Sequence, residues 1–402
     1  MDRPAMEHSQ HRAVILVLAA LSALGPFSVD MYLPGFPAIA AGLKTNIAHV
    51  ALSLTSYFIG MSVGQLAYGP VMDRYGRRRP LIVGLVMYVV AALGCAFSPS
   101  IYFLIALRLF QALGGCVGLA GSRAVVRDLF SANEIARVLS MLMMVFGIAP
   151  IVAPTIGGLV VATLGWRFIF LILAGIAALI LLAVNRFLPE SKGADSSISL
   201  YPKSVLLEYL NVYREPTFLR HTLASAAAMA GFFSYIAGSP FVYMKLFGLS
   251  ETQFAWMYGT NVLGLIIASQ INRVWLRRRS AAEVLFMANA AQVFVALMLV
   301  TGVHFRLIGT IATIGLIFSY LFFFGFVSPN AVALALQPFA RNAGSAAALI
   351  GSIQMVAAAS SSGLVSYLHN GTALPMLSLM AGCASVCLVL LSVGSDHSRE
   401  PG

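Results

Sequence analysis

Apolar runs of about 20 residues, separated by short polar turns, extend along almost the whole chain. This length matches the hydrocarbon thickness that one α-helix must cross. The strands of a membrane β-barrel would instead alternate apolar and polar residues in segments of about 10. The pattern predicts an all-α membrane protein with twelve spans, roughly at 13–34, 48–71, 80–97, 101–122, 136–162, 166–187, 219–244, 252–272, 281–302, 307–329, 343–367 and 371–393.

The longest polar stretch lies between the sixth and seventh predicted spans. It predicts a linker over 189–218, joining an N-terminal six-helix bundle over 1–188 to a C-terminal six-helix bundle over 219–402. Each half has a basic turn after its second span, "DRYGRRRP" in the first and "NRVWLRRRS" in the second. Repeated halves are typical of transporters whose binding site lies at the membrane midplane. We therefore expect alternating access, with one cavity lined by both halves.

Composition and charge support the membrane interpretation. Of the residues, 59% are hydrophobic and 10% are charged, whereas soluble domains carry about 25% charged residues. The net charge of +11 lies in short turns, which does not suit nucleic-acid binding. By the positive-inside rule, twenty of the twenty-five Lys and Arg fall on the side of the N-terminus, so both termini are expected in the cytoplasm.

Two charges interrupt the predicted spans. Asp30, in "GPFSVDMYLPGFP", is the acid that falls inside an apolar run, and Arg108, in "LIALRLFQALGGC", is the basic residue that does so. Charge at membrane depth costs about 2.5–3.5 kcal/mol on insertion scales and by default indicates a functional site. Both fall in the outer half of their spans, so we expect a coupled pair, direct or through water. An acid reaching water at the boundary and an arginine tying helices to backbone carbonyls are the structural alternatives.

Two further stretches suggest moving parts rather than ligand contacts. "GPVMDRYGRRRPL" combines Gly69, Asp73, Arg74, Gly76 and Arg77. There Gly76 permits a tight turn, and Asp73 can pair with a basic group or face a helix N-terminus. "APIVAPTIGG" places Pro150 and Pro154, which soften a helix, before Gly157 and Gly158, which permit close helix approach. A generic kinked helix would explain the second stretch equally well.

In this order, these stretches resemble the major facilitator superfamily over essentially the whole chain. "DMYLPGFP" is similar to the first-span signature of its bicyclomycin/chloramphenicol-resistance (Bcr/CflA) group of twelve-span drug:proton antiporters. "VRDLF", "SPFVY", "SPNAVALALQPF" and "AGSAAALIGSIQ" resemble that group too. Ala149 and Ala153 replace two glycines of the fifth-span motif, which is associated with export. Ser22 stands where some relatives carry a second acid, which argues against a two-acid, two-proton scheme; with Asp30 as the single acid, one proton per neutral substrate is the simplest scheme.

The resemblance implies roles for particular residues. Asp30 and Arg108 would couple protons and contact substrate, and Arg127 would join the gating residues. Aromatic and amide side chains on the spans are the remaining candidates for substrate contact, and each is also explained by helix packing. They are Tyr57, Gln111, Phe232, Phe233, Tyr235, Asn261, Asn330 and Gln354.

The sequence therefore predicts a multi-pass protein of the bacterial inner membrane, expected to be a monomer. Its expected partners are the lipid bilayer, protons and a small organic substrate, with no cofactor, metal or nucleic acid. Proton-coupled efflux of phenicol- or bicyclomycin-like drugs is favoured. A metabolite exporter, for nucleosides or amino-acid derivatives, and a proton-symport importer remain alternatives. A membrane enzyme is disfavoured because we find no metal cluster, nucleotide loop or Ser-His pairing in the sequence.

Overall fold

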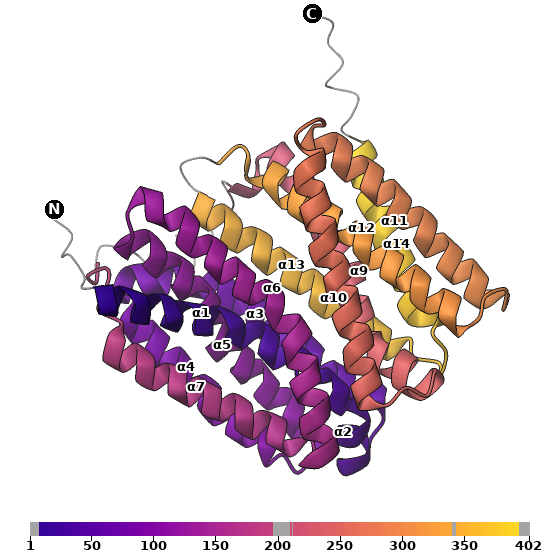
Figure 1. Cartoon of the computed structure of the whole chain (residues 1–402), viewed down its shortest axis with the longest axis horizontal. Coiled ribbons are helices and arrows are strands. Elements are labelled where there is room, and N and C mark those ends of the chain that lie inside the picture. The colour runs from indigo at the N-terminus through magenta and orange to yellow at the C-terminus, as the bar shows by residue number, and fades with distance from the viewer. Residues whose placement is uncertain (1–7, 196–209, 211, 340–342, 394–402) are drawn as a thin grey trace, which may run out of the picture. The chain divides into compact units, whose positions relative to one another are not determined.

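The chain folds into long helices, and the predicted twelve-span, all-α architecture is confirmed (Figure 1). The computed structural model describes residues 8–195, 210, 212–339 and 343–393. Within these residues, twelve helical segments are long and apolar enough to cross a membrane.

The helices of the N-terminal half, apart from the start of α3, pack into one compact unit. They are α1 (His8–Asp30), the short 3-10 helix η1 (Leu33–Gly35), α2 (Phe36–Gly42), α3 (Ile47–Tyr75), α4 (Arg78–Ala96), α5 (Ile101–Leu129), α6 (Ala132–Thr163) and α7 (Arg167–Phe187). This first unit comprises residues 1–45 and 56–206.

The second unit comprises residues 46–55 and 207–402. Its helices are α9 (Pro216–Pro240), the π-helical turn η2 (Phe241–Leu246), α10 (Glu251–Trp275), α11 (Ala281–His304), α12 (Thr310–Leu336), α13 (Ala343–Tyr367) and α14 (Leu374–Ser392). The start of α3 belongs to this unit, and Thr55 Oγ1 donates to Ser362 Oγ of α13 at 3.1 Å. Of the predicted linker, 196–209 and 211 lie outside the described residues.

Glycines set how closely α5 packs in the first unit. A β-carbon on Gly114 would overlap the backbone of Gly84 and Tyr88 on α4. A β-carbon on Gly118 would overlap the carbonyl oxygen of Leu21 on α1. Such close approach is what small residues provide where helices pack in membranes. As a result, α5 lies directly against both α1 and α4, and its side chains can reach their backbones.

Several predicted boundaries differ from the structure. Helix α5 continues to Leu129 rather than ending at 122, α12 continues to Leu336 rather than ending at 329, and three further differences concern the first, second and seventh spans. The first helix ends at Asp30, before 34, because "YLPGFP" forms a turn and the short helices η1 and α2. The second span extends beyond 71 to Tyr75, so Asp73 and Arg74 are helical rather than part of a loop. The seventh span changes to a π-helical turn after Pro240. Proline lacks an N–H group, which favours interruption of regular α-helical bonding at that position.

Candidate functional site

Arg108 is completely buried on α5, and other elements of the first unit hold its guanidinium. Nη1 donates to Oε1 of Gln111 at 2.8 Å, one turn along the same helix. Nη2 donates to the carbonyl oxygen of Ser28 on α1 at 3.0 Å. Arginine therefore ties α5 to the end of α1, as the structural alternative for this residue predicted.

Aromatic rings contact the same guanidinium. Its central carbon lies 4.3 Å from the ring centroid of Tyr57 on α3 and 4.7 Å from that of Tyr32, just after α1. Phe170 of α7 lies 5.9 Å away. A cation over an aromatic face gains about 0.5–2 kcal/mol, more where water is excluded. These contacts stabilise a positive charge that would otherwise be costly to bury.

Asp30 is the last residue of α1 and is 5% exposed. The final carbonyl groups of a helix have no partner within it, and Arg108 supplies one to Ser28, two residues before Asp30. Tyr57 lies within electrostatic range of both Asp30 and Arg108. The first unit thus gathers four predicted site residues, Asp30, Tyr57, Arg108 and Gln111, in one buried cluster.

Hydroxyl groups extend this cluster, and those of Ser28, Tyr88 and Ser122 are not among the residues predicted from the sequence. The hydroxyl of Ser28 lies 2.5 Å from that of Tyr88 on α4 and donates to the carbonyl of Leu24. Further along α1, Ser22 donates to Ser122 Oγ of α5 at 3.0 Å. Polar side chains on otherwise apolar spans were the available signal for Ser28 and Tyr88.

Three buried donors of the cluster make no hydrogen bond of standard geometry to a described residue. They are Nε of Arg108, Nε2 of Gln111 and the hydroxyl of Tyr57. A buried polar group without a hydrogen bond costs about 1–3 kcal/mol. All three groups can donate, so the cluster is suited to a group that accepts hydrogen bonds, such as a carbonyl, carboxylate or nitro oxygen.

The "APIVAPTIGG" stretch reaches the same region. A β-carbon on Gly157 of α6 would overlap the carbonyl oxygen of Met31, the residue after Asp30. Gly157 and Gly158 are both buried, and α6 continues as one helix through Pro150 and Pro154. Glycine at 157 is thus required for α6 to pack on the end of α1, and the gating role of this stretch stays a prediction.

The second unit distributes its predicted site residues over separate contacts. Asn261 of α10 donates to the hydroxyl of Tyr235 on α9 at 2.8 Å. On α9, Phe232 packs edge-on against Phe233, with ring centroids 5.5 Å apart. The ring of Phe232 also stacks on that of Phe324 of α12, with ring centroids 4.8 Å apart. The sequence alone did not predict which of these residues contact one another.

Two other candidates serve as ties between helices in this structure. Asn330 of α12 donates to Oδ1 of Asn272 at 2.8 Å, and Gln354 of α13 donates to Oγ of Ser225 at 2.5 Å. Both side chains are more than nine-tenths buried. Substrate contact by Asn330 and Gln354 stays a prediction.

An ion-pair network surrounds the turn between α3 and α4. Arg77 bonds to Asp73 at 2.9 Å and to Asp128 of α5 at 2.8 Å. Asp73 also pairs with Lys192 at 3.0 Å. Burial alone would lower the pKa of Arg77, but the hydrogen bonds and charges of Asp128 and Asp73 outweigh it and raise that pKa. Asp73 therefore pairs with basic groups, one of the two predicted possibilities.

A different acid occupies the helix N-terminus at this turn. Glu190, which follows α7, accepts from the backbone N–H of Arg77 at 2.6 Å and from that of Arg78. A carboxylate is stabilised at this end of a helix. Gly76 has φ +84°, as its predicted tight turn requires, and a β-carbon there would also meet the Glu190 carboxylate.

The remaining gating candidates have fewer contacts. The carbonyl oxygen of Arg74 accepts from the backbone N–H of Asp195 at 3.1 Å. Arg127 is exposed, with no ion pair to any described residue. Nothing within 4 Å would meet a β-carbon on Gly69, so packing does not explain that glycine.

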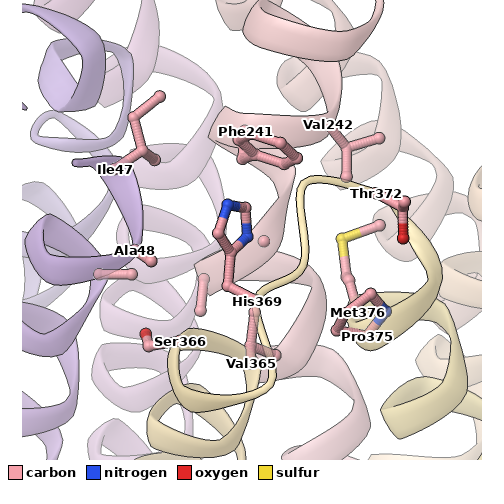
Figure 2. A pocket seen from close by; sticks show the side chains of 13 residues that line it. Ile47, Ala48, Phe241, Val242, Val365, Ser366, His369, Thr372, Pro375 and Met376 are labelled. Carbon is pink, nitrogen blue, oxygen red and sulfur yellow. The ribbon is translucent and has the colours of Figure 1, made fainter.

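A pocket in the second unit is lined by none of the predicted substrate contacts (Figure 2). The start of α3, the α9–η2 junction, the end of α13 and the start of α14 enclose about 340 Å³, including space open to solvent. His369 points into it, and its ring meets Phe241 edge-on at 4.4 Å. Burial lowers the pKa of His369. No predicted substrate-binding residue lines this pocket.

Similarity to known proteins agrees with this architecture. The chain is 34% identical over 378 residues to the uncharacterized MFS-type transporter YdgK of Bacillus subtilis, covering 92% of each chain. It is 32% identical to a bicyclomycin resistance protein homolog of Haemophilus influenzae, covering 93% of this chain and 94% of that protein. The predicted resemblance to the bicyclomycin/chloramphenicol-resistance group is thereby confirmed.

The fold matches a solved transporter as well. The xylose transporter XylE of Escherichia coli, in a partially occluded inward-open conformation, superposes with a TM-score of 0.72 at 13% identity. The match covers 98% of this chain and all of XylE. Residues 18–362 match the profile of the Major Facilitator Superfamily. The chain is a multi-pass membrane transporter, not an enzyme, and it belongs to the Major Facilitator Superfamily.

Proposed function

We propose that this protein exports small, uncharged antibiotics of the bicyclomycin or phenicol type from the bacterial cytoplasm in exchange for protons. The observation that carries the proposal is the buried cluster in the first unit. It combines Asp30, an acid that is 5% exposed, with a fully buried arginine. The name of the Haemophilus relative supports a drug as the substrate.

Asp30 is proposed as the acid that carries the proton. An uncharged carboxyl group is far cheaper to hold at membrane depth than a carboxylate, so the surroundings of Asp30 control its protonation. Arg108 already has two hydrogen bonds, to Ser28 and Gln111. Protonation of Asp30 therefore does not deprive the guanidinium of these partners, and the first unit can stay folded in both protonation states.

Arg108, Gln111 and Tyr57 are proposed to receive the substrate. Their three unpaired donors favour a molecule that presents oxygen acceptors and carries no positive charge. The guanidinium would repel an organic cation. Tyr235, Asn261 and Phe232 are proposed contacts from the second unit, with Phe233, Asn330 and Gln354.

The energetics favour a simple exchange. One proton moving inward against one neutral molecule moving outward transfers one charge, worth about 2.3 kcal/mol at 100 mV. At about 1.4 kcal/mol per decade, this sustains roughly a fifty-fold gradient. We also propose that the protein works by alternating access as a monomer in a bacterial inner membrane, with both termini in the cytoplasm. The ion pairs of Arg77 are proposed to form and break during this cycle.

Inverted membrane vesicles with an acidified interior would test the proposal. Bicyclomycin, a phenicol and a nucleoside are added separately, and release of protons from the vesicles is followed. We expect drug-dependent release for the native protein, none for Asp30→Asn, and release unchanged for Glu251→Gln, an acid in the first turn of α10. Undiminished release by Asp30→Asn would refute its role, and a response to the nucleoside alone would replace the drug by a metabolite.

A further inference from the structure

The basic turn of the second unit is built differently from its counterpart in the first unit. Arg77 of the first turn is paired with Asp73 and Asp128, and Arg78 donates to Asn185 at 2.8 Å. The second turn carries Arg273, Arg277, Arg278 and Arg279, which we call the α10–α11 arginine cluster. All four are exposed, and none forms an ion pair with a described residue.

The cluster is held in an ordered turn at the ends of α10 and α11 (Figure 1). The backbone N–H groups of Arg278 and Arg279 donate to the carbonyl of Trp275 at 2.9 and 3.0 Å. The nearby acid, Glu283, accepts from the N–H of Ser280 and completes the capping box of α11. It therefore contributes to the helix end and does not neutralise the arginines.

Exposed apolar side chains border the arginines on both helices. Val274, Trp275 and Leu276 at the end of α10 are between 39% and 57% exposed. Phe286 and Met287 in the second turn of α11 are also exposed, and Arg279 lies against the sulfur of Met287 at 3.4 Å. Positive charge next to exposed apolar surface at the end of a span matches the boundary between lipid head groups and acyl chains.

We propose that the α10–α11 arginine cluster binds the phosphate head groups of anionic phospholipids, while the bordering apolar side chains contact their acyl chains. Arginine suits this ligand because its planar fork donates two hydrogen bonds to phosphate oxygens. A soluble acidic partner would not require the apolar border at the level of the span ends. The first-unit turn should bind such lipids less well, because its acids already occupy Arg77.

Trp275 provides a reporter inside the proposed site. The chain has three tryptophans, and changing Trp166 and Trp256 to Phe leaves Trp275 alone. This full-length protein is reconstituted into phosphatidylcholine bilayers with brominated phosphatidylglycerol, or brominated phosphatidylcholine, at equal fractions. Quenching of Trp275 fluorescence by each lipid gives the preference for the anionic head group without any transport measurement.

The expected result is a preference of at least about five-fold for phosphatidylglycerol, the effect of one arginine near an anionic surface. The triple variant R277Q/R278Q/R279Q should reduce the preference to about one-fold, and the corresponding triple lysine variant should retain most of it. Arg186→Gln is the matched control, because Arg186 is also exposed at the end of a span. It should leave the preference unchanged.

Several results would overturn the proposal. Equal quenching by both lipids would show that the cluster does not select anionic head groups. A preference that survives R277Q/R278Q/R279Q would place the lipid elsewhere. Loss of the preference on adding millimolar glycerophosphate would show that the cluster binds free phosphate rather than lipid. If the triple variant does not fold, the preference of the unaltered cluster must still fall as salt is raised, or the proposal fails.

Discussion

Replacing Arg108 by lysine tests how the buried cluster is held together. Lysine keeps the positive charge but presents one ammonium group in place of a planar fork. In the structure the two terminal nitrogens of Arg108 point to different partners, the amide oxygen of Gln111 and the carbonyl oxygen of Ser28. A lysine at this position can keep at most one of these bonds in good geometry.

The cost can be worked from these contacts. Loss of one hydrogen bond made by a charged group costs about 1.5–3 kcal/mol. Poorer stacking on Tyr57 and Tyr32, now at 4.3 and 4.7 Å, adds about 0.5–1 kcal/mol. We expect Arg108→Lys to lower the free energy of unfolding by about 2–4 kcal/mol. If the same contacts hold the substrate-binding state, transport falls roughly 30- to 700-fold.

Denaturant unfolding in mixed micelles gives the free energy directly, and the vesicle assay gives transport. Arg167→Lys is the matched control, because Arg167 stacks on Trp166 at 4.3 Å but is exposed. It should cost less than about 1 kcal/mol, the upper value for an exposed cation–π contact. If Arg108→Lys costs no more than Arg167→Lys, the fork does not hold the cluster and the reasoning is wrong.

Three further predictions concern packing and protonation in the first unit. Gly157→Ala should lower the free energy of unfolding by about 1–3 kcal/mol and abolish transport, because the added β-carbon meets a backbone carbonyl. Gly147 faces open space, so Gly147→Ala should cost far less. Equal costs for the two variants would contradict the packing argument. Gly76→Ala should destabilise more than Gly165→Ala, since both have positive φ but only Gly76 faces a carboxylate; equal thermal shifts would exclude that contact. Hydrogen bonds from the side chain and backbone of Ser131, the N-cap of α6, lower the pKa of Glu134 below its usual 4.5. The stabilising contribution of Glu134 is therefore present above pH 4.5 and is lost as the pH falls further. The thermal unfolding temperature of Glu134→Gln should lack this pH dependence. If that variant and the native protein show the same dependence on pH, Glu134 is not its source.

The sequence was sufficient for the number of spans and for the two charges within them. Apolar runs of span length have few other interpretations, and a charge inside one is costly enough to stand out. The end of α1 could not be placed in the same way. "DMYLPGFP" is apolar after its first residue, so hydropathy continues past Asp30 although regular helix stops there.

Contacts that the sequence did not predict share a physical reason: their partners are backbone groups or lie far away in the sequence. Arg108 binds the backbone carbonyl of Ser28, and a carbonyl group leaves no signature in the sequence. Glu190 caps α4 from 113 residues away, and only the folded chain brings these segments together. Amide side chains show the reverse problem: Asn330 and Gln354 were chosen as substrate contacts, and each is already bonded to a side chain of a neighbouring helix.

The position of Asp30 at a helix end explains how one cluster can hold a fixed cation and an acid that changes charge. The last carbonyl groups of α1 carry the negative end of the helix dipole, and Arg108 neutralises that end through Ser28. Two of the bonds that anchor the cation, to Ser28 and to Gln111, are thus made to groups whose charge does not change. Asp30 can then gain or lose a proton without releasing α5 from α1. For the same reason Asp30→Asn should fold normally, so that a loss of coupling in that variant would report on the proton and not on the structure.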